Sequence, residues 1–204
     1  MKKLLIATKN PAKFSDIKSS LIDLPFQFVS LNDIGIEDDV SETGKTFEEN
    51  ARKKALFYAN KSGLITVSDD GGVEIDALGG EPGVKTRRWI DNKEESDDRL
   101  LKYTLVRMHE VPEEKRGAQL RAIICVVTPR GDTCMVEGVM RGIIAKKPYK
   151  EYKEGFPFDA LLYIPKYKKY YYELKYLDKN PTNHRTIALK KLHPILKKMI
   201  KVVK

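Results

Sequence analysis

Residues 67–84 read VSDDGGVEIDALGGEPGV, and the interpretation of the chain depends on two neighbouring residues in that stretch. An apolar run over residues 64–68 indicates a buried strand, and Asp69 and Asp70 follow it directly. A turn would account for aspartates beside glycines, but a turn does not require two carboxylates. The alternative is that both carboxylates bind a metal ion and a water molecule.

The composition indicates a well-folded protein of moderate size. A length of 204 residues, 41% of them hydrophobic and 33% charged, suffices for one sizeable α/β domain or for one domain with a smaller lobe. Cys125 and Cys134 are too few and too far apart for a disulfide framework, and we expect small core residues in a reducing compartment. The apolar runs are too short to cross a membrane, and the opening MKKLLIATKNP indicates a strand and not a signal peptide. We therefore predict a cytoplasmic protein without a membrane partner.

A net charge of +9 raises the question of nucleic-acid binding. Residues 166–176 mix tyrosine with lysine, as a single-strand binder does. A solvated strand or loop face explains the same segment, and a basic protein also attracts small polyanions. We favour a small polyanionic substrate over nucleic acid.

Periodicity places strands and helices alternately along the chain. We expect strands at 3–8, 64–68 and 160–164, helices at 11–24, 46–61, 97–109 and 184–200, and a long hairpin over 118–144. Thr46 and Glu49 predict a capping box, and Ser96 is expected to cap the third helix. Strands interleaved with helices, together with a hairpin, indicate an α/β fold with a mixed sheet.

The segment ATKNPAK predicts an anion site at the start of the first helix. Asn10 is expected to cap this helix, and Pro11 suits its first position. Lys13 then lies in the first turn, where the helix dipole disfavours a cation unless an anion binds nearby. Thr8, Asn10 and Lys13 therefore form a candidate phosphate cradle, and a capped helix with a solvated lysine is the alternative.

The helix at 46–61 presents an apolar stripe made of Phe47, Ala51, Ala55 and Tyr58. Asn50 and Lys54 fall at the edge of this stripe, four residues apart and facing the core. Lys54 either extends its ammonium to solvent or meets phosphate oxygens.

Acidic residues near these segments suggest a magnesium site. Glu42 precedes the second helix, and Mg²⁺ prefers a couple of carboxylates with water and substrate phosphates. Asp70 could bind the metal or orient an attacking water. Glycines at 71 and 72 would let a ligand approach the backbone closely.

Two late segments suggest a base-binding site. Gly155 to Asp159, GFPFD, place two aromatic rings around a turn, which gives either a stacking platform or core packing. Asn183 is expected to cap the last helix, whose first turn carries His184 and Arg185. Both side chains can donate hydrogen bonds to carbonyl oxygens, or they can be surface residues.

Five segments in this order resemble the inosine triphosphate pyrophosphatase family, enzymes that remove non-standard purine nucleoside triphosphates. The segments are ATKNPAKFSD, ETGKTFEENARKKA, SDDGGVEIDALGGEPGVKTRRW, GFPFD and DKNPTNHR. The resemblance implies one α/β domain, residues 1–204, with an elongated mixed sheet, flanking helices and two lobes around a central cleft. It also implies a homodimer, and Mg²⁺-dependent hydrolysis of a nucleoside triphosphate to the monophosphate and pyrophosphate.

The resemblance assigns roles by position. Asp70 would be the general base and would bind Mg²⁺ together with Glu42. The residues that would bind the substrate are Thr8, Lys9, Asn10, Lys13, Lys54, Gly71, Phe156, Pro157, Phe158, Asp159, Lys179, His184 and Arg185. Among these, residues 156–159 would hold the purine, and the last three would favour a 6-oxo group over the amino group of adenine.

The chain departs from the family pattern at several of these positions. Family members commonly have Ser at Gly71, Gly at Pro157, Tyr or Trp at Phe158, and Ser at Asn183. Selection of a 6-oxo base depends on the pairing of buried polar groups, so these departures bear on base selectivity more than on phosphate chemistry.

Other classes of function remain open. A basic nucleic-acid-binding module would use residues 166–176 but would leave the acidic residues unexplained. A nucleotide-binding regulator with weakened catalysis is suggested by Gly71 and Pro157. A related pyrophosphatase for damaged or deoxy-pyrimidine nucleotides is a third alternative.

Overall fold

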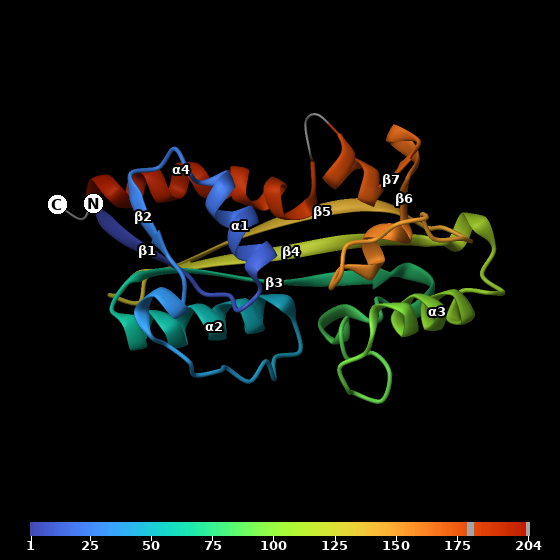
Figure 1. The fold of residues 1–204 in the computed structure, drawn as a ribbon, viewed down its shortest axis with the longest axis horizontal. Coiled ribbons are helices and arrows are strands. Elements are labelled where there is room, and N and C mark those ends of the chain that lie inside the picture. The colour runs from blue at the N-terminus through green and yellow to red at the C-terminus, as the bar shows by residue number, and fades with distance from the viewer. Residues whose placement is uncertain (179–181, 203–204) are drawn as a thin grey trace. The chain divides into compact units, whose positions relative to one another are not determined.

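The computed structural model describes residues 1–178 and 182–202, with side chains in the last helix described through Met199. The strands are β1 (Lys2–Ile6), β2 (Phe26–Val29), β3 (Ile65–Ile75), β4 (Gly117–Val127), β5 (Thr133–Ile144), β6 (Leu162–Ile164) and β7 (Lys169–Tyr170). The α-helices are α1 (Pro11–Ser20), α2 (Phe47–Ser62), α3 (Asp97–Arg107) and α4 (His184–Val202). Figure 1 shows their arrangement.

The strands form a mixed sheet in the order β2-β1-β3-β4-β5-β6-β7. Strand β1 pairs in parallel with β2 and β3, whereas β6 pairs antiparallel with β5 and β7. The predicted α/β class with a mixed sheet and flanking helices is therefore confirmed. No helix within the described residues is long and apolar enough to cross a membrane.

The chain divides into two compact units, which we describe separately. Unit 1 contains Met1–Gly71, Ala122–Gly138 and the residues from His184 onward, and unit 2 contains Gly72–Arg121 and Val139–Asn183. Strands β3, β4 and β5 contribute residues to both units. The number of independent domains stays a prediction.

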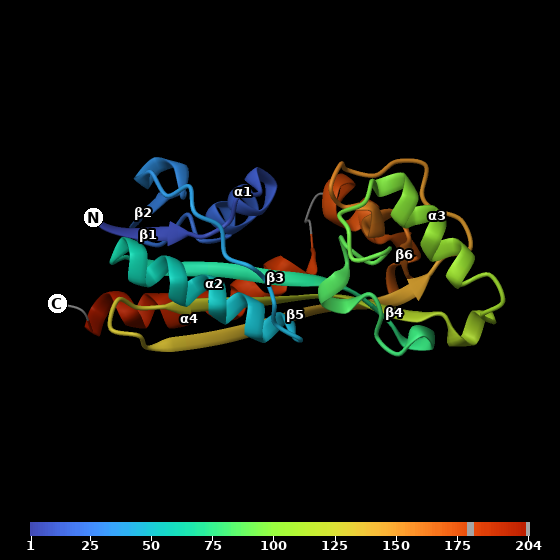
Figure 2. The ribbon, with the colours of Figure 1, turned by 90° about the horizontal axis from the view of Figure 1, so that it is seen from below.

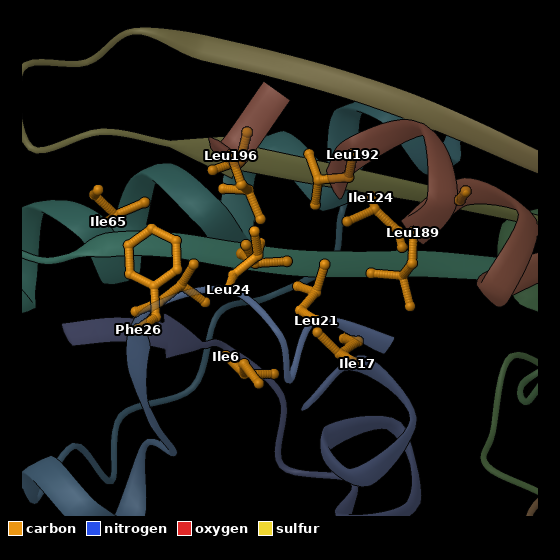
Figure 3. Packing of buried hydrophobic residues seen from close by; sticks show 14 residues of the cluster. Ile6, Ile17, Leu21, Leu24, Phe26, Ile65, Ile124, Leu189, Leu192 and Leu196 are labelled. Atoms are coloured by element: carbon orange, nitrogen blue, oxygen red, sulfur yellow. The ribbon is translucent and has the colours of Figure 1, made fainter. Parts of the chain in front are cut away.

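In unit 1, alternate residues of the first strand face different helices, as the period of a strand requires. Leu4 and Ile6 belong to a buried cluster with residues of α1 and α4, and Figure 3 shows leucines 189, 192 and 196 of α4 in that cluster. Leu5 and Ala7 belong to a second cluster with Tyr58 of α2. Helix α2 thus lies on one side of these strands, alongside β3 (Figure 2), and α1 and α4 lie on the other (Figure 1).

Most predicted helix starts are confirmed at the level of the cap. The Asn10 side chain accepts hydrogen bonds from the backbone N–H groups of Ala12 and Lys13 at 2.9 and 3.2 Å. Ser96 caps α3, and Thr46 caps α2 by accepting from the Glu49 N–H at 3.2 Å. The capping box is incomplete, because Glu49 accepts instead from the N–H of Lys45 at 2.6 Å.

Unit 2 contains a buried arginine that ties distant backbone segments together. Arg116 is 3% exposed and donates to the carbonyl oxygens of Met108 at 2.6 Å and Ile144 at 2.7 Å. It also reaches the carbonyls of Val111 and Ala145 at 3.2 and 3.3 Å. Carbonyl groups that would otherwise be buried without partners are thereby satisfied, and the end of α3 is held beside the end of β5.

Several boundaries differ from the sequence-based expectations. The first helix ends at Ser20 and not at residue 24, and the strand expected at 160–164 begins at Leu162, because residues 157–160 form a 3₁₀ turn. The strand or loop face expected at 166–176 is present only in the first half of the segment, where an exposed turn and the short β7 lie, and a π-helical turn over Glu173–Leu177 follows. Cys125 is buried as expected, whereas Cys134 is partly exposed, and both are free thiols.

Candidate active site

Strand β3 does not end before the two aspartates but continues through them to Ile75. The turn interpretation is therefore wrong, and Asp69 and Asp70 are buried, with exposures of 1% and 7%. Their side chains lie on opposite faces of the strand. Val67 packs in the cluster with α1 and α4, and Asp69 shares that face. Ser68 donates to the Ala51 carbonyl of α2 at 2.6 Å, and Asp70 shares that face.

Asp69 lies between two cations. Its Oδ2 atom is 3.2 Å from Lys13 Nζ and 3.1 Å from Arg185 Nε. Burial alone would raise the pKa of Asp69, but the charges of Lys13 and Arg185, with Lys54 further off, hold that pKa well below its usual range. Asp69 is therefore an ionised anchor for the two cations, and the idea that both aspartates bind metal and water is not supported for this one.

The candidate phosphate cradle is present in part. Lys13 is mostly buried against Asp69, so the alternative of a solvated lysine is wrong. Thr8 lies next to the cap, where its Oγ1 accepts from the Asn10 N–H at 3.2 Å. Lys9 does not join them, because it is exposed and its ammonium lies 3.3 Å from Asp39.

On the other face of β3, one lysine joins two carboxylates. Lys54 Nζ is 2.5 Å from Glu42 Oε1 and 3.6 Å from Asp70 Oδ1. Burial would lower the pKa of Lys54, but the surrounding carboxylates raise it. Burial raises the pKa of Asp70, and the charges of Glu42 and Asp69 raise it further against the opposing charge of Lys54. The interpretation of Lys54 as a lysine that extends to solvent is wrong.

This cluster is suited to a divalent cation completed by other ligands. Within the described residues, no group of three or more His, Cys, Asp or Glu side chains is arranged to hold a metal. Mg²⁺, however, is commonly held by one or two carboxylates, with waters and substrate phosphates filling its other positions. Glu42 and Asp70 fit that pattern, since their two negative charges share a single ammonium group.

Asn50 is a candidate that the sequence placed near the core but not in the site. It is 1% exposed, and its Oδ1 accepts from the Gly44 N–H at 2.8 Å. Its Nδ2 has no hydrogen-bond partner among the described residues, and the same holds for Asp69 Oδ1. A buried amide donor without a partner is costly. Asn50 lies one helical turn before Lys54, so it could donate to a ligand of that lysine.

The two glycines after the aspartates, Gly71 and Gly72, differ in the space beside them. A Cβ atom on Gly72 would lie 2.0 Å from Thr86 Oγ1, and that hydroxyl accepts from the Val73 N–H at 3.2 Å. The space beside Gly72 is thus filled by the protein, and the expectation that it admits a ligand is wrong. Gly71 is partly exposed within the strand.

In unit 2, the predicted base-binding segment forms a short 3₁₀ turn over Pro157–Ala160. Phe158 is buried, which fits the core-packing alternative, whereas Phe156 is only partly buried. Asp159 Oδ2 lies 3.0 Å from Lys175 Nζ and accepts from Tyr176 Oη at 3.1 Å. Lys175 is a buried charged residue that sequence reasoning missed, because it lies in a tyrosine- and lysine-rich stretch.

The first turn of α4 carries two further residues of the predicted site. His184 and Arg185 are both buried, so their interpretation as surface residues is wrong. Arg185 also lies 3.4 Å from Asp16, which sequence reasoning did not select. A Cβ atom on Gly138 of β5 would lie 1.9 Å from the His184 carbonyl oxygen, so only glycine fits there. Lys179 lies outside the described residues, and its role stays a prediction.

Comparison with known proteins identifies the family. Residues 4–195 match the Ham1 family. A dITP/XTP pyrophosphatase of Clostridium perfringens is 36% identical over 210 residues, covering 98% of this chain and all of that protein. One of Bacillus subtilis is 37% identical over 196 residues, covering 96% and 98%.

Solved structures agree with the sequence relatives. A HAM1 protein from Coxiella burnetii has a TM-score of 0.86 at 30% identity, with 97% of this chain and all of that chain covered. The Ham1 protein of Staphylococcus aureus has a TM-score of 0.85 at 31% identity, with the same coverage. The resemblance stated from the sequence is confirmed, and the chain belongs to the Ham1 family.

Proposed function

We propose that this protein is a nucleoside triphosphate pyrophosphatase that hydrolyses ITP, dITP and XTP between the α and β phosphates, giving the monophosphate and pyrophosphate. The observation that carries the proposal is the cluster of Glu42, Lys54 and the buried Asp70 in a member of the Ham1 family. The names of the relatives, dITP/XTP pyrophosphatases, support this substrate class.

In this proposal Glu42 and Asp70 hold Mg²⁺. When bound, the metal would supply charge neutralisation for the triphosphate. Asp70 accepts the proton of the attacking water, and Lys54 keeps the two carboxylates from repelling each other in the free enzyme. Because Asp70 lies 3.6 Å from Lys54 while Glu42 lies at 2.5 Å, Asp70 is the less tightly engaged carboxylate and the better candidate for the base.

The phosphate chain is bound by cations and amide groups of unit 1. Lys13 and Lys54 supply positive charge, and Thr8, Asn10 and the start of α1 supply polar groups at a helix N-terminus. Asn50 donates from its Nδ2, which has no partner in the part of the chain that the structure describes. We retain Lys9 and Gly71 as substrate contacts from the family pattern. The exposed position of Lys9, beside Asp39, does not favour its role.

The purine is bound by residues 156–159 of unit 2. The partly exposed Phe156 ring offers a stacking face, and Asp159 supplies a carboxylate beside it. Lys179, His184 and Arg185 are retained from the family pattern as residues that favour a 6-oxo group. A homodimer in the cytoplasm completes the proposal, and the two free cysteines fit a reducing compartment.

The test is pyrophosphate release from ITP, dITP, XTP, GTP and ATP, measured with MgCl₂ and again with EDTA. We expect metal-dependent pyrophosphate from ITP, dITP and XTP and little from ATP and GTP. Orthophosphate as the only product would refute cleavage between the α and β phosphates. Binding of ITP without any turnover would favour a nucleotide-binding regulator.

A further inference from the structure

Lys175 of unit 2 is a buried ammonium surrounded by aromatic rings. Its side chain is 4% exposed, and its Nζ lies 4.2 Å from the centroid of the Phe156 ring and 4.8 Å from that of Tyr176. The Tyr171 ring follows at 6.0 Å. These distances are those of cation–π contacts, which are strongest where water is excluded.

The same ammonium forms the buried ion pair with Asp159, at 3.0 Å and with the carboxylate side chain 3% exposed. Tyr176 Oη donates to the same carboxylate oxygen. Lys175 therefore contacts both groups that the proposed function gives to the base, the ring of Phe156 and the carboxylate of Asp159. It neutralises the charge of Asp159 and covers a face of the Phe156 ring.

Neutralisation of Asp159 changes which bases the pocket favours. A carboxylate with no cation beside it accepts strongly from exocyclic amino groups, which adenine and guanine carry and hypoxanthine and xanthine lack. A carboxylate paired with an ammonium loses much of this attraction. The ammonium also makes the local potential more favourable to carbonyl oxygens.

We propose that Lys175 is a positioning residue that sets base preference, by neutralising Asp159 and by fixing the Phe156 ring. This inference rests on the proposed function of the same site. Lys175 acts through these two residues, so its removal changes the discrimination between bases and leaves the phosphate chemistry of unit 1 in place.

The experiment compares kcat and KM for ITP, XTP, GTP and ATP in the wild type and in Lys175→Met. We expect the preference for XTP over GTP, as a ratio of kcat/KM, to fall by about tenfold or more. The change should lie mainly in KM. Inhibition by inorganic tripolyphosphate, which has no base, should stay the same, and Lys175→Arg should restore the preference.

Two further variants make the result decisive. Lys153→Met removes an exposed lysine that lies 5.5 Å from the same Tyr176 ring, and it should keep the wild-type preference. If Lys175→Met does not fold, Lys175→Gln keeps a hydrogen-bond donor beside Asp159 but removes the positive charge, and it should also lose the preference.

The outcomes separate the two proposals. If the wild type hydrolyses none of the four nucleotides, the proposed function fails and this inference with it. If the wild type prefers XTP and ITP, and Lys175→Met or Lys175→Gln keeps that preference, the inference about Lys175 alone is overturned.

Discussion

The two faces of strand β3 carry opposite electrostatic arrangements, although the residues that define them are adjacent in sequence. On the face toward α1 and α4, Asp69 is held by two cations. On the face toward α2, Asp70 shares one ammonium with a second carboxylate. On the first face the two cations are matched by the carboxylates of Asp69 and Asp16, and the second face has negative charge left for a further cation.

This difference indicates separate tasks for the two carboxylates. A carboxylate with strong partners resists protonation and fixes the groups around it, whereas a buried carboxylate with weaker partners can take up a proton or a metal. Asp69 is therefore expected to matter for the fold of unit 1, and Asp70 for the reaction. Substitutions on each face test this division.

The largest effect is expected for Asp70→Asn. An amide keeps the shape but cannot accept the proton of water, so kcat should fall by about 10³-fold, within the range for loss of a general base. Pyrophosphate release measures the loss, and the melting temperature should change little. Asp23→Asn, at an exposed carboxylate paired with His193, is the control and should keep wild-type rates. Wild-type rates in Asp70→Asn would remove the proposed base.

Asp69→Asn should behave in the opposite way. It leaves Lys13 and Arg185 without their shared carboxylate, and breaking a buried charge pair typically costs about 3 kcal/mol or more of unfolding free energy. Urea denaturation measures this change. The contrast between the two faces fails if Asp69→Asn is as stable as the wild type while Asp70→Asn is strongly destabilised.

Gly138→Ala should disturb the Asp69 face alone. The added methyl group would lie 1.9 Å from the His184 carbonyl oxygen, so the first turn of α4, with Arg185, must shift. Overpacking of this kind costs about 2 kcal/mol, which urea denaturation can detect. Glu137→Ala, at the exposed neighbouring position, is the matched control. An unchanged stability of Gly138→Ala would mean that α4 adjusts without cost.

The smallest effect is expected for Lys54→Met on the other face. Without the ammonium, Glu42 and Asp70 should bind Mg²⁺ more tightly, by about tenfold or about 1.4 kcal/mol. Stability measured in MgCl₂ and in EDTA should therefore differ more for the variant than for the wild type. Lys61→Met, at a surface lysine paired with Asp38, provides the comparison. An equal Mg²⁺ effect in all three proteins would argue against a metal at these carboxylates.

Much of unit 1 was predictable because its signals are local. The caps at Asn10 and Thr46 and the apolar stripe of α2 depend on residues a few positions apart. The continuation of β3 was not predictable in this way, because Asp and Gly are disfavoured in strands. Cations from α1, α2 and α4 compensate the buried aspartates, and those contacts are long-range.

The candidate site was also predictable only where its signals are local. Sequence reasoning selected Lys13, Lys54 and Arg185 by residue type and position, but it could not show that two of them meet Asp69 and one meets Asp70. Lys175 was missed because the local sequence does not distinguish a buried lysine from an exposed one. Its partner, Asp159, lies in another turn of the chain.

The two faces of β3 also differ in when the growing chain can complete them. Glu42, Lys54 and Asp70 have all been synthesised by the time residue 70 is added. Arg185 follows Asp69 by 116 residues. At usual rates of translation that interval is on the order of ten seconds, during which Asp69 lacks one of its two cations and the α4 leucines are missing from the core of unit 1. The face of Asp70 is therefore available early to the nascent chain, and the face of Asp69 is completed only after α4 has been synthesised.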